Sequence, residues 1–444
     1  MDDLKSVGIG PLEMTESDLS PATELFSDPK DDLSMVEGRF IVYDPTNNSD
    51  SEYDFTIPPT GMTYLQLSAT RIYVRARIVQ ENGANIIADD EGKVAFVNMP
   101  LAAMFSRIEV SLDGSPQADL SNSYSNYKGF LETMMSYSQE AADNHLSGGI
   151  VIMDTPSFFN NFTGEDNTNE GFQGRSALVG RSSVFELMGQ LHSDFFQIKK
   201  FFPPGIKLTV RLTRAPDNFV ICTSVPGKRF KLKVEKILLH VRHVTMSDAL
   251  LNHHQKLMAS DKKLIIPYSK TEIRAFTFNQ SSSINLTNVV QENLPRQIVF
   301  GFVRSANVYG SYTTNPWYFE HLDVDNLFIT VGGVMVPSKP YTPDFNNNIY
   351  AREYREFMDN IGLSTGNHAN MISPALYNNG LTLFAHDLTP DMCNGFHQHP
   401  RRTGCINIEA HFRTQITESV TAIVMCIYPA KLELVKKKIV TALV

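Results

Sequence analysis

Two histidines and one carboxylate stand at a spacing that could hold a metal ion. His192 and Asp194 flank a single serine, and His240 or His243 follows about fifty residues later. Two histidines and one carboxylate can bind one face of an iron(II) ion and leave positions open for substrate and oxygen. One interpretation is therefore a non-haem iron oxygenase that binds its metal through His192, Asp194 and His243.

The sequence around these residues argues against that site. Such oxygenases usually carry an arginine shortly after the distal histidine, whereas the segment after His243 reads VTMSDALLNHHQKLM. Asp194 also follows an apolar run, where a turn favours an aspartate. We therefore expect no catalytic residue, no cofactor and no resident metal, and the oxygenase is kept as the alternative.

Other catalytic patterns fail in the same way. His397 and His399 have metal-ligand spacing, but the next glutamate is Glu409, too far along for the usual HxH metal motif. The chain contains no GxSxG, HExxH or GxxxxGK[ST] sequence. We expect the protein not to be an enzyme.

Composition restricts the partners. The 444 residues are enough for two or three domains, and 42% of them are apolar. A net charge of −9 disfavours specific nucleic-acid binding, because phosphate contacts require clustered Lys and Arg. No apolar run approaches the roughly 18 residues of a membrane span. Residues 1–35 carry nine acids and two lysines and are expected to form an arm, while Lys436–Lys438 is a basic run near the end.

Short alternating or apolar runs separated by turn residues dominate from Phe40 onward, which is typical of β-sandwiches. In the first half we expect strands at 40–43, 54–57, 71–80, 108–112, 184–191, 206–212 and 234–244. In the second half we expect them at 271–278, 297–303, 327–336, 381–385, 406–412 and 422–428.

The two halves show the same features in the same order. A strand runs into Asp113-Gly114 in the first half and into Gly332-Gly333 in the second, and each turn is followed by aromatics at helical spacing. The residues expected to pack these two helices are Tyr124, Tyr127 and Phe130, and Tyr350, Tyr354 and Phe357. We expect an N-terminal arm at 1–35, a first sandwich with its linker at 36–262, a second sandwich at 263–435 and a lysine-bearing tail at 436–444.

Five motifs in order over residues 40–434 resemble a known family. They are Val110–Gly114, Glu186–Phe196, Gly310–Pro316, Val336–Pro340 with Pro343–Phe345, and Leu383–Asp391. The chain resembles the double jelly-roll major capsid proteins of Polinton/Maverick elements, adintoviruses and their virophage-like relatives. The resemblance implies an all-β fold of two consecutive eight-stranded jelly rolls with short helices in the connecting loops.

The resemblance also implies an assembly. Three chains around a threefold axis would form a pseudo-hexagonal capsomer, and such trimers would tile an icosahedral shell around a double-stranded DNA genome. The implied partners are further copies of the chain, neighbouring capsomers and minor or penton capsid proteins. The implied location is the virion capsid, after synthesis in the host cytoplasm, with nuclear assembly as an option. A carbohydrate-binding sandwich remains, beside the oxygenase, the alternative.

Two long loops, 155–182 and 363–379, are rich in Asn, Gly and Ser. Loops of this length usually serve function or contact a neighbour. We expect them on the outer surface or at contacts between chains, and we expect the acidic arm to clasp a neighbouring subunit or a minor capsid protein.

Overall fold

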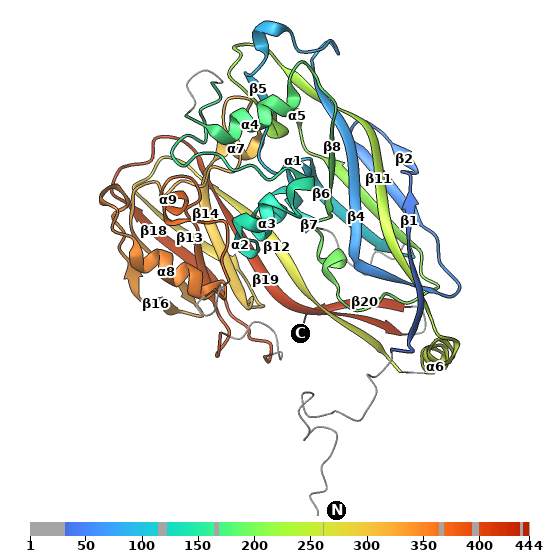
Figure 1. The fold of residues 1–444 in the computed structure, drawn as a ribbon. Helices are drawn as coiled ribbons and strands as arrows, with labels where there is room; N and C mark the ends of the chain where they lie inside the picture. Colours follow the sequence, from blue (N-terminus) through green and yellow to red (C-terminus); the bar gives the residue numbers. More distant parts are fainter. Residues whose placement is uncertain are drawn as a thin grey trace, which may run out of the picture.

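Two β-sandwiches lie side by side in the structure, a computed structural model that describes residues 32–113, 122–163, 168–260, 262–363, 368–392, 399–435 and 438–443. The first sandwich carries the long upright strands on the right of Figure 1, and the second lies on the left. Strand β1 begins, and β20 lies, on the lower side of this view.

Eight strands build the first sandwich. They are β1 (Met35–Tyr43), β3 (Glu52–Ile57), β4 (Thr63–Gln80), β6 (Phe105–Leu112), β7 (Asn122–Ser123), β8 (Phe185–Gln190), β9 (Leu208–Arg214) and β11 (Phe230–Met246). One sheet has the order β1-β11-β4-β8, and the facing sheet has the order β3-β9-β6-β7, with the short β2 (Asn47–Asn48) at its edge. Counted along the chain, the two orders are first-eighth-third-sixth and second-seventh-fourth-fifth.

The second sandwich repeats that order. Its strands are β12 (Leu264–Phe278), β13 (Ser283–Val290), β14 (Gln297–Arg304), β15 (Val324–Val331), β16 (Val334–Tyr341), β17 (Phe384–Asp387), β18 (Ile406–Phe412) and β19 (Val420–Val435). The sheets are β12-β19-β14-β17 and β13-β18-β15-β16. Both halves therefore have jelly-roll topology, and the fold is all-β, as predicted.

Short elements connect and extend the sheets. A ribbon of β5 (Val94–Phe96) and β10 (Ile221–Thr223) lies outside the first sandwich, and β20 (Lys438–Leu443) pairs with β19. The α-helices are α1 (Pro100–Ala103), α2 (Ser125–Ser136), α3 (Gln139–Asp143), α4 (Glu170–Val179), α5 (Asp217–Val220), α6 (Asp248–Ala259), α7 (Ser305–Tyr309), α8 (Ala351–Asn360) and α9 (Pro374–Asn378). The 3-10 turns are η3 (Ala88–Asp90), η4 (Ser147–Gly149), η5 (Asp194–Gln197) and η6 (Phe345–Asn347). No helix of the described residues is long and apolar enough to cross a membrane.

The two predicted aromatic helices are confirmed as α2 and α8, and they occupy the same place in the two topologies. Each lies between the fifth and the sixth strand of its jelly roll. The Gly332-Gly333 turn is also present, and its φ angles of +57° and +85° fit the tight hairpin that glycine permits. The matching turn after β6 lies mostly outside the described residues.

Three expectations are corrected by the structure. The strand predicted over 327–336 is two strands, because the glycine pair turns the chain between β15 and β16. The loop 155–182 contains the helix α4 with buried Phe172 and Arg175, and 363–379 contains α9 with buried Tyr377. Much of both segments is therefore packed inside the chain rather than presented on an outer surface.

Candidate functional site

The junction between the two jelly rolls begins with a tryptophan. Trp317, which precedes β15, is fully buried and stacks on Phe130 of α2 with ring centroids 4.4 Å apart and planes 2° apart. Tyr127 and Phe219 meet the same indole edge-on at 5.3 and 5.4 Å. The Tyr127 hydroxyl donates to the carbonyl of Pro316 at 3.1 Å. A helix of the first jelly roll therefore holds a side chain of the second in an aromatic box.

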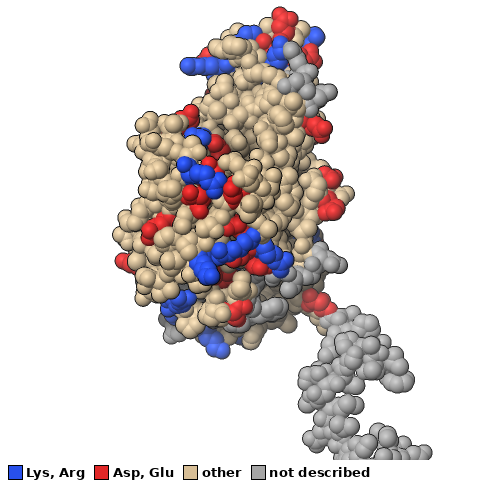
Figure 2. Space-filling view, turned by 90° about the vertical axis from the view of Figure 1, so that its left-hand side faces the viewer, with Lys and Arg blue, Asp and Glu red and all other residues tan. Residues whose placement is uncertain are grey.

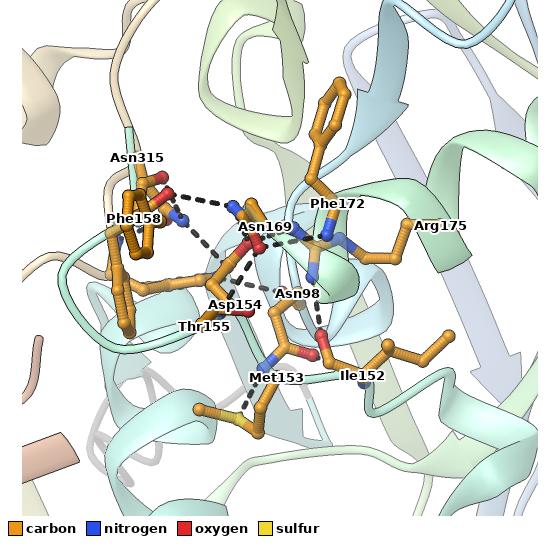
Figure 3. A network of polar contacts seen from close by, with 12 residues as sticks. Asn98, Ile152, Met153, Asp154, Thr155, Phe158, Asn169, Phe172, Arg175 and Asn315 are labelled. Carbon is orange, nitrogen blue, oxygen red and sulfur yellow. Dashed lines mark hydrogen bonds and ion pairs between the residues drawn. The ribbon is translucent and has the colours of Figure 1, made fainter. Parts of the chain in front are cut away.

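A buried carboxylate adds a polar network beside the box (Figure 3). Asp154 accepts from the Arg175 guanidinium at 2.6 Å and from the Asn169 and Asn315 amides at 2.9 Å each. Arg175 is fully buried and also donates to the carbonyls of Phe96 and Ile152. Because Asn315 comes from the second jelly roll and the other side chains from the first, Asp154 joins the two.

Two asparagines fix the loops around that carboxylate. Asn169 caps α4 by accepting from the backbone N–H of Phe172, and its own amide donates to Asp154. Asn98 accepts from the Ile152 N–H through its side chain, while its carbonyl accepts from the Trp317 indole at 2.8 Å. These contacts satisfy buried polar groups that would otherwise destabilise the junction.

A second charged cluster crosses the junction near η5. Lys128 of α2 is fully buried, and its ammonium lies 2.6 Å from the Glu132 carboxylate and 3.3 Å from that of Asp194. Asp194 in turn accepts from the backbone N–H of Thr271 in β12 at 2.9 Å. The Asp194 carboxylate thus connects a buried cation of the first jelly roll to a strand of the second.

The charges in this cluster support one another. Burial lowers the pKa of the Lys128 ammonium, but the carboxylates of Asp194 and Glu132 raise it more, so the pKa lies above its ordinary value. Burial raises the pKa of the Glu132 carboxyl, but Lys128 and His192 lower it more, and the pKa falls to about 2. The cluster is therefore an ion network at neutral pH.

The structure does not assemble the alternative metal site. Asp194 is held by Lys128 and Thr271, whereas His243 of β11 hydrogen-bonds through its ring to the Tyr43 and Thr63 hydroxyls at 3.0 and 3.3 Å. Within the described parts of the chain, no group of three or more His, Cys, Asp and Glu is placed to hold a metal. The geometry of His192, Asp194 and His243 therefore does not fit the iron alternative.

Three aromatics were expected to pack each helix, and the two helices use them differently. Tyr127, Phe130 and Phe357 are buried, whereas Tyr124, with φ of +52° just before α2, is 39% exposed and stands outside the packed set. In the second jelly roll the predicted tyrosines pack within their own domain. Their hydroxyls donate to the carbonyls of α9 and the residues before it, Tyr350 to Pro374 and Tyr354 to Ile372.

The β1-β11-β4-β8 sheet of the first jelly roll and the equivalent β12-β19-β14-β17 sheet of the second differ in what covers their outer faces. Seven successive residues of β14, Gln297–Val303, are buried, so both faces of this strand are covered. A side chain at Gly301 would meet Phe319, whose ring lies beside those of Tyr127 and Phe130. Phe319 and Leu383 of the second jelly roll thus lie directly over Gly301, and α2 of the first jelly roll packs on Phe319 from outside.

The equivalent face of the first jelly roll lies open. Along β4, buried residues alternate with residues that are partly or fully exposed. On the outer side of β1-β11-β4-β8, Phe40 is 49% exposed, Val42 46% and Met188 44%. These three residues lie on the edge strands β1 and β8, and exposed charged residues such as Arg75 and Glu235 lie on β4 and β11 between them. Exposed apolar residues on a sheet face are one feature of an interface with another protein.

Comparisons with solved structures identify the architecture. A chain of the Sputnik virophage matches with a TM-score of 0.60 at 14% identity and covers 96% of this chain and 92% of its own. The mavirus major capsid protein matches with a TM-score of 0.56 at 11% identity, covering 98% and 96%. A chain of the PBCV-1 virus capsid gives 0.56 at 9% identity, covering 94% and 98%. The fold is a double jelly roll.

Comparison of sequences finds a distant relative. An uncharacterized protein of Caenorhabditis elegans is 23% identical over 382 residues, which cover 82% of this chain and 86% of that protein. No protein-family model matches the chain. The likeness covers most of both chains.

The junction residues were largely missed by sequence reasoning. Trp317 is the only tryptophan of the chain and directly follows the Gly310–Pro316 motif, which is a signal that could have marked it. The segment 155–182 was interpreted as an exposed loop. Asp154 directly precedes it, and Arg175 lies within it. Asp194 was singled out for the wrong chemistry, because its partners lie on α2 and β12.

Proposed function

We propose that this protein is a major capsid protein whose role is structural rather than enzymatic. The observation that carries the proposal is the open outer face of the β1-β11-β4-β8 sheet, which exposes Phe40, Val42 and Met188 at the position where the second jelly roll is covered within the same chain. The shared fold with the mavirus major capsid protein and the PBCV-1 capsid chain supports it.

The repeated topology specifies how copies would meet. Inside one chain, α2 of the first jelly roll packs on Phe319, which lies over the sheet of the second. If the same contact is repeated between chains, the α8 side of the second jelly roll covers the β1-β11-β4-β8 sheet of the next copy. Such a head-to-tail contact either closes into a ring or continues as a filament, and three chains with six similar lobes close a ring.

The side that would make this contact also carries apolar residues. Ile349, directly before α8, is 64% exposed, and Val334 in the hairpin of β15 and β16 is 66% exposed. Figure 2, which faces the α8 side, shows wide uncharged areas with positive and negative residues close together between them. A surface of this composition suits an interface whose centre is apolar and whose rim is charged.

We propose a finer assignment as well. Trimeric pseudo-hexagonal capsomers would tile an icosahedral shell around double-stranded DNA, with minor and penton proteins as further partners and without specific nucleic-acid binding. We assign the chain to the Polinton/Maverick, adintovirus and virophage-like lineage and its location to the virion capsid, after synthesis in the host cytoplasm. The division into 1–35, 36–262, 263–435 and 436–444 is part of the same proposal.

Changing the open face tests the proposal. Phe40→Asp places a charge on the edge strand β1 of the proposed contact face, and light scattering of the purified full chain should show a trimer of three times 49.8 kDa become a monomer. Ile87→Asp is the matched control, because Ile87 is 44% exposed but lies away from this sheet. A wild-type chain that stays monomeric, or a Phe40→Asp chain that stays trimeric, would contradict the proposed contact.

A further inference from the structure

A cavity of about 600 Å³ opens where the two jelly rolls meet. The first jelly roll contributes η5 and the residues after it, and the second contributes the start of β12, the turn before β14 and the segment after β17. Five of its lining residues are cations, namely Lys199, Lys200, Arg296, Arg401 and Arg402. Among the described lining residues the single acid is Asp194, which is already bound to Lys128.

The five cations have no acidic partner among the described residues. Arg402 donates to the carbonyl of Leu388 at 2.8 Å and Arg401 donates to the Asn293 amide oxygen, both of which are neutral acceptors. Many other cations are paired, as Arg304 is with Glu320 at 2.9 Å, and Figure 2 shows blue beside red in the middle of the face that it presents. The cavity is therefore a concentration of positive charge in a protein with a net charge of −9.

We propose that this cavity binds the acidic N-terminal segment of the chain, residues 1–31. The segment contains eight acids and two lysines, a formal charge of −6. Its acids are interspersed with apolar residues such as Leu12, Met14 and Phe26, and the cavity walls carry Leu294, Leu388 and several prolines beside the cations. Charge and apolar character thus match between the segment and the cavity.

The segment is long enough to reach. Met35 at the start of β1 pairs with Met246, and only the helix α6 and short flanks separate Met246 from Pro267 at the cavity. A 12-residue helix and nine extended residues span at most roughly 50 Å. Thirty-one extended residues span roughly 100 Å, so the segment can reach the cavity of its own chain. Because segment and cavity share a polypeptide, their effective concentration is high.

Nucleic acid is the competing polyanion, and the observations favour the segment. Binding of a phosphate backbone needs basic residues spread along a stripe and is opposed by the acidic charge of the whole protein. Here five cations without an acidic partner in the described part of the chain converge on one cavity with apolar walls. The inference does not rest on capsid assembly, since it concerns one chain.

Hydrogen exchange of the full-length chain tests the inference. Part of residues 1–31 should exchange about tenfold more slowly than a free peptide of the same sequence at low salt, and the protection should vanish at about 1 M NaCl. Lys199→Glu with Lys200→Glu should abolish the protection, because both side chains are exposed and reversal turns attraction into repulsion. Lys207→Glu with Lys256→Glu is the matched control, with the same change of net charge on exposed residues that line neither the cavity nor the proposed contact face.

Each outcome bears on the proposal. Loss of protection in the cavity variant alone, with an unchanged melting temperature, supports it. Equal exchange in the wild type and both variants overturns it. The proposal is also overturned if a DNA duplex of about 20 base pairs binds through Lys199 and Lys200 while the segment stays unprotected. If the double variant melts early, the salt titration of the wild type decides.

Discussion

The two jelly rolls have one topology but treat the same sheet face in opposite ways. In the second, the outer face of the β12-β19-β14-β17 sheet is covered by Phe319 and Leu383, and α2 packs on Phe319 from outside. In the first, the outer face of the β1-β11-β4-β8 sheet presents Phe40, Val42 and Met188 to solvent. The outer face of this sheet is covered in the second jelly roll. We therefore expect the same face of the first jelly roll to be covered by another chain.

The contact inside the chain also shows what such a cover consists of. It combines stacked aromatics with two buried ion pairs, Asp154 with Arg175 and Lys128 with Asp194. The open face has exposed apolar residues but no buried charge. We expect the contact within the chain to be permanent and the contact between chains to respond more readily to mutation and solution conditions.

The largest effect should come from breaking the buried ion pair. Asp154→Ala leaves the fully buried Arg175 without its counter-charge, which costs about 3–5 kcal/mol of unfolding free energy. Glu91→Ala removes the partner of Arg181 in an exposed pair and should cost less than about 1 kcal/mol. Denaturant unfolding of both variants measures the difference. Equal losses would mean that the junction is not anchored at Asp154.

Acidification should destabilise the second jelly roll and the junction over different pH ranges. Burial lowers the pKa of His386 in the second jelly roll to about 4, so the unfolded chain takes up a proton there first. Stability is full above pH 6.5 and falls by about 3 kcal/mol as the pH drops towards 4. Glu132 at the junction, with a pKa of about 2, contributes stability that is lost only below about pH 4.5.

Replacing His386 tests whether this histidine causes the loss of stability between pH 6.5 and 4. His386 lies against the rings of Tyr341 and Phe300, so His386→Phe should fit and flatten the stability profile between pH 4 and 6.5. His253→Phe, at an exposed histidine of α6, should leave the profile unchanged. Thermal melting across the pH series checks both. A profile that keeps its slope in His386→Phe assigns the acid sensitivity to another group.

The smallest change in stability is expected from removing single tyrosine hydroxyls. Tyr127→Phe removes a buried hydrogen bond to Pro316 across the junction and should cost about 1–2 kcal/mol. Tyr354→Phe removes a bond to Ile372 within the second jelly roll from a half-buried side chain and should cost about 0.5–1 kcal/mol. Chemical denaturation resolves the two, and a reversed order would place the stronger coupling inside the second jelly roll.

Local patterns made most of the fold predictable. Alternation marked strands such as β9 and β18, and aromatic spacing marked α2 and α8. Strand β13 was missed, because SINLTNVV is rich in Ser, Asn and Thr and is buried at only a few positions.

The junction could not be predicted from local patterns. Asp154 binds Arg175 at a separation of 21 residues and Asn315 at 161, and no periodicity relates such residues. The same reason explains the misassigned chemistry at Asp194. A turn that needs an acid and a carboxylate that joins two domains look alike until β12 is placed beside it.

Negative-stain electron microscopy of the purified full-length chain tests the central claim most directly. Six lobes arranged around a threefold axis are expected, since each chain supplies two similar jelly rolls and the open face of each is covered by the next copy. Particles with only two lobes at every protein concentration would contradict the account, because the open face on the first jelly roll would then be left without the partner that explains it.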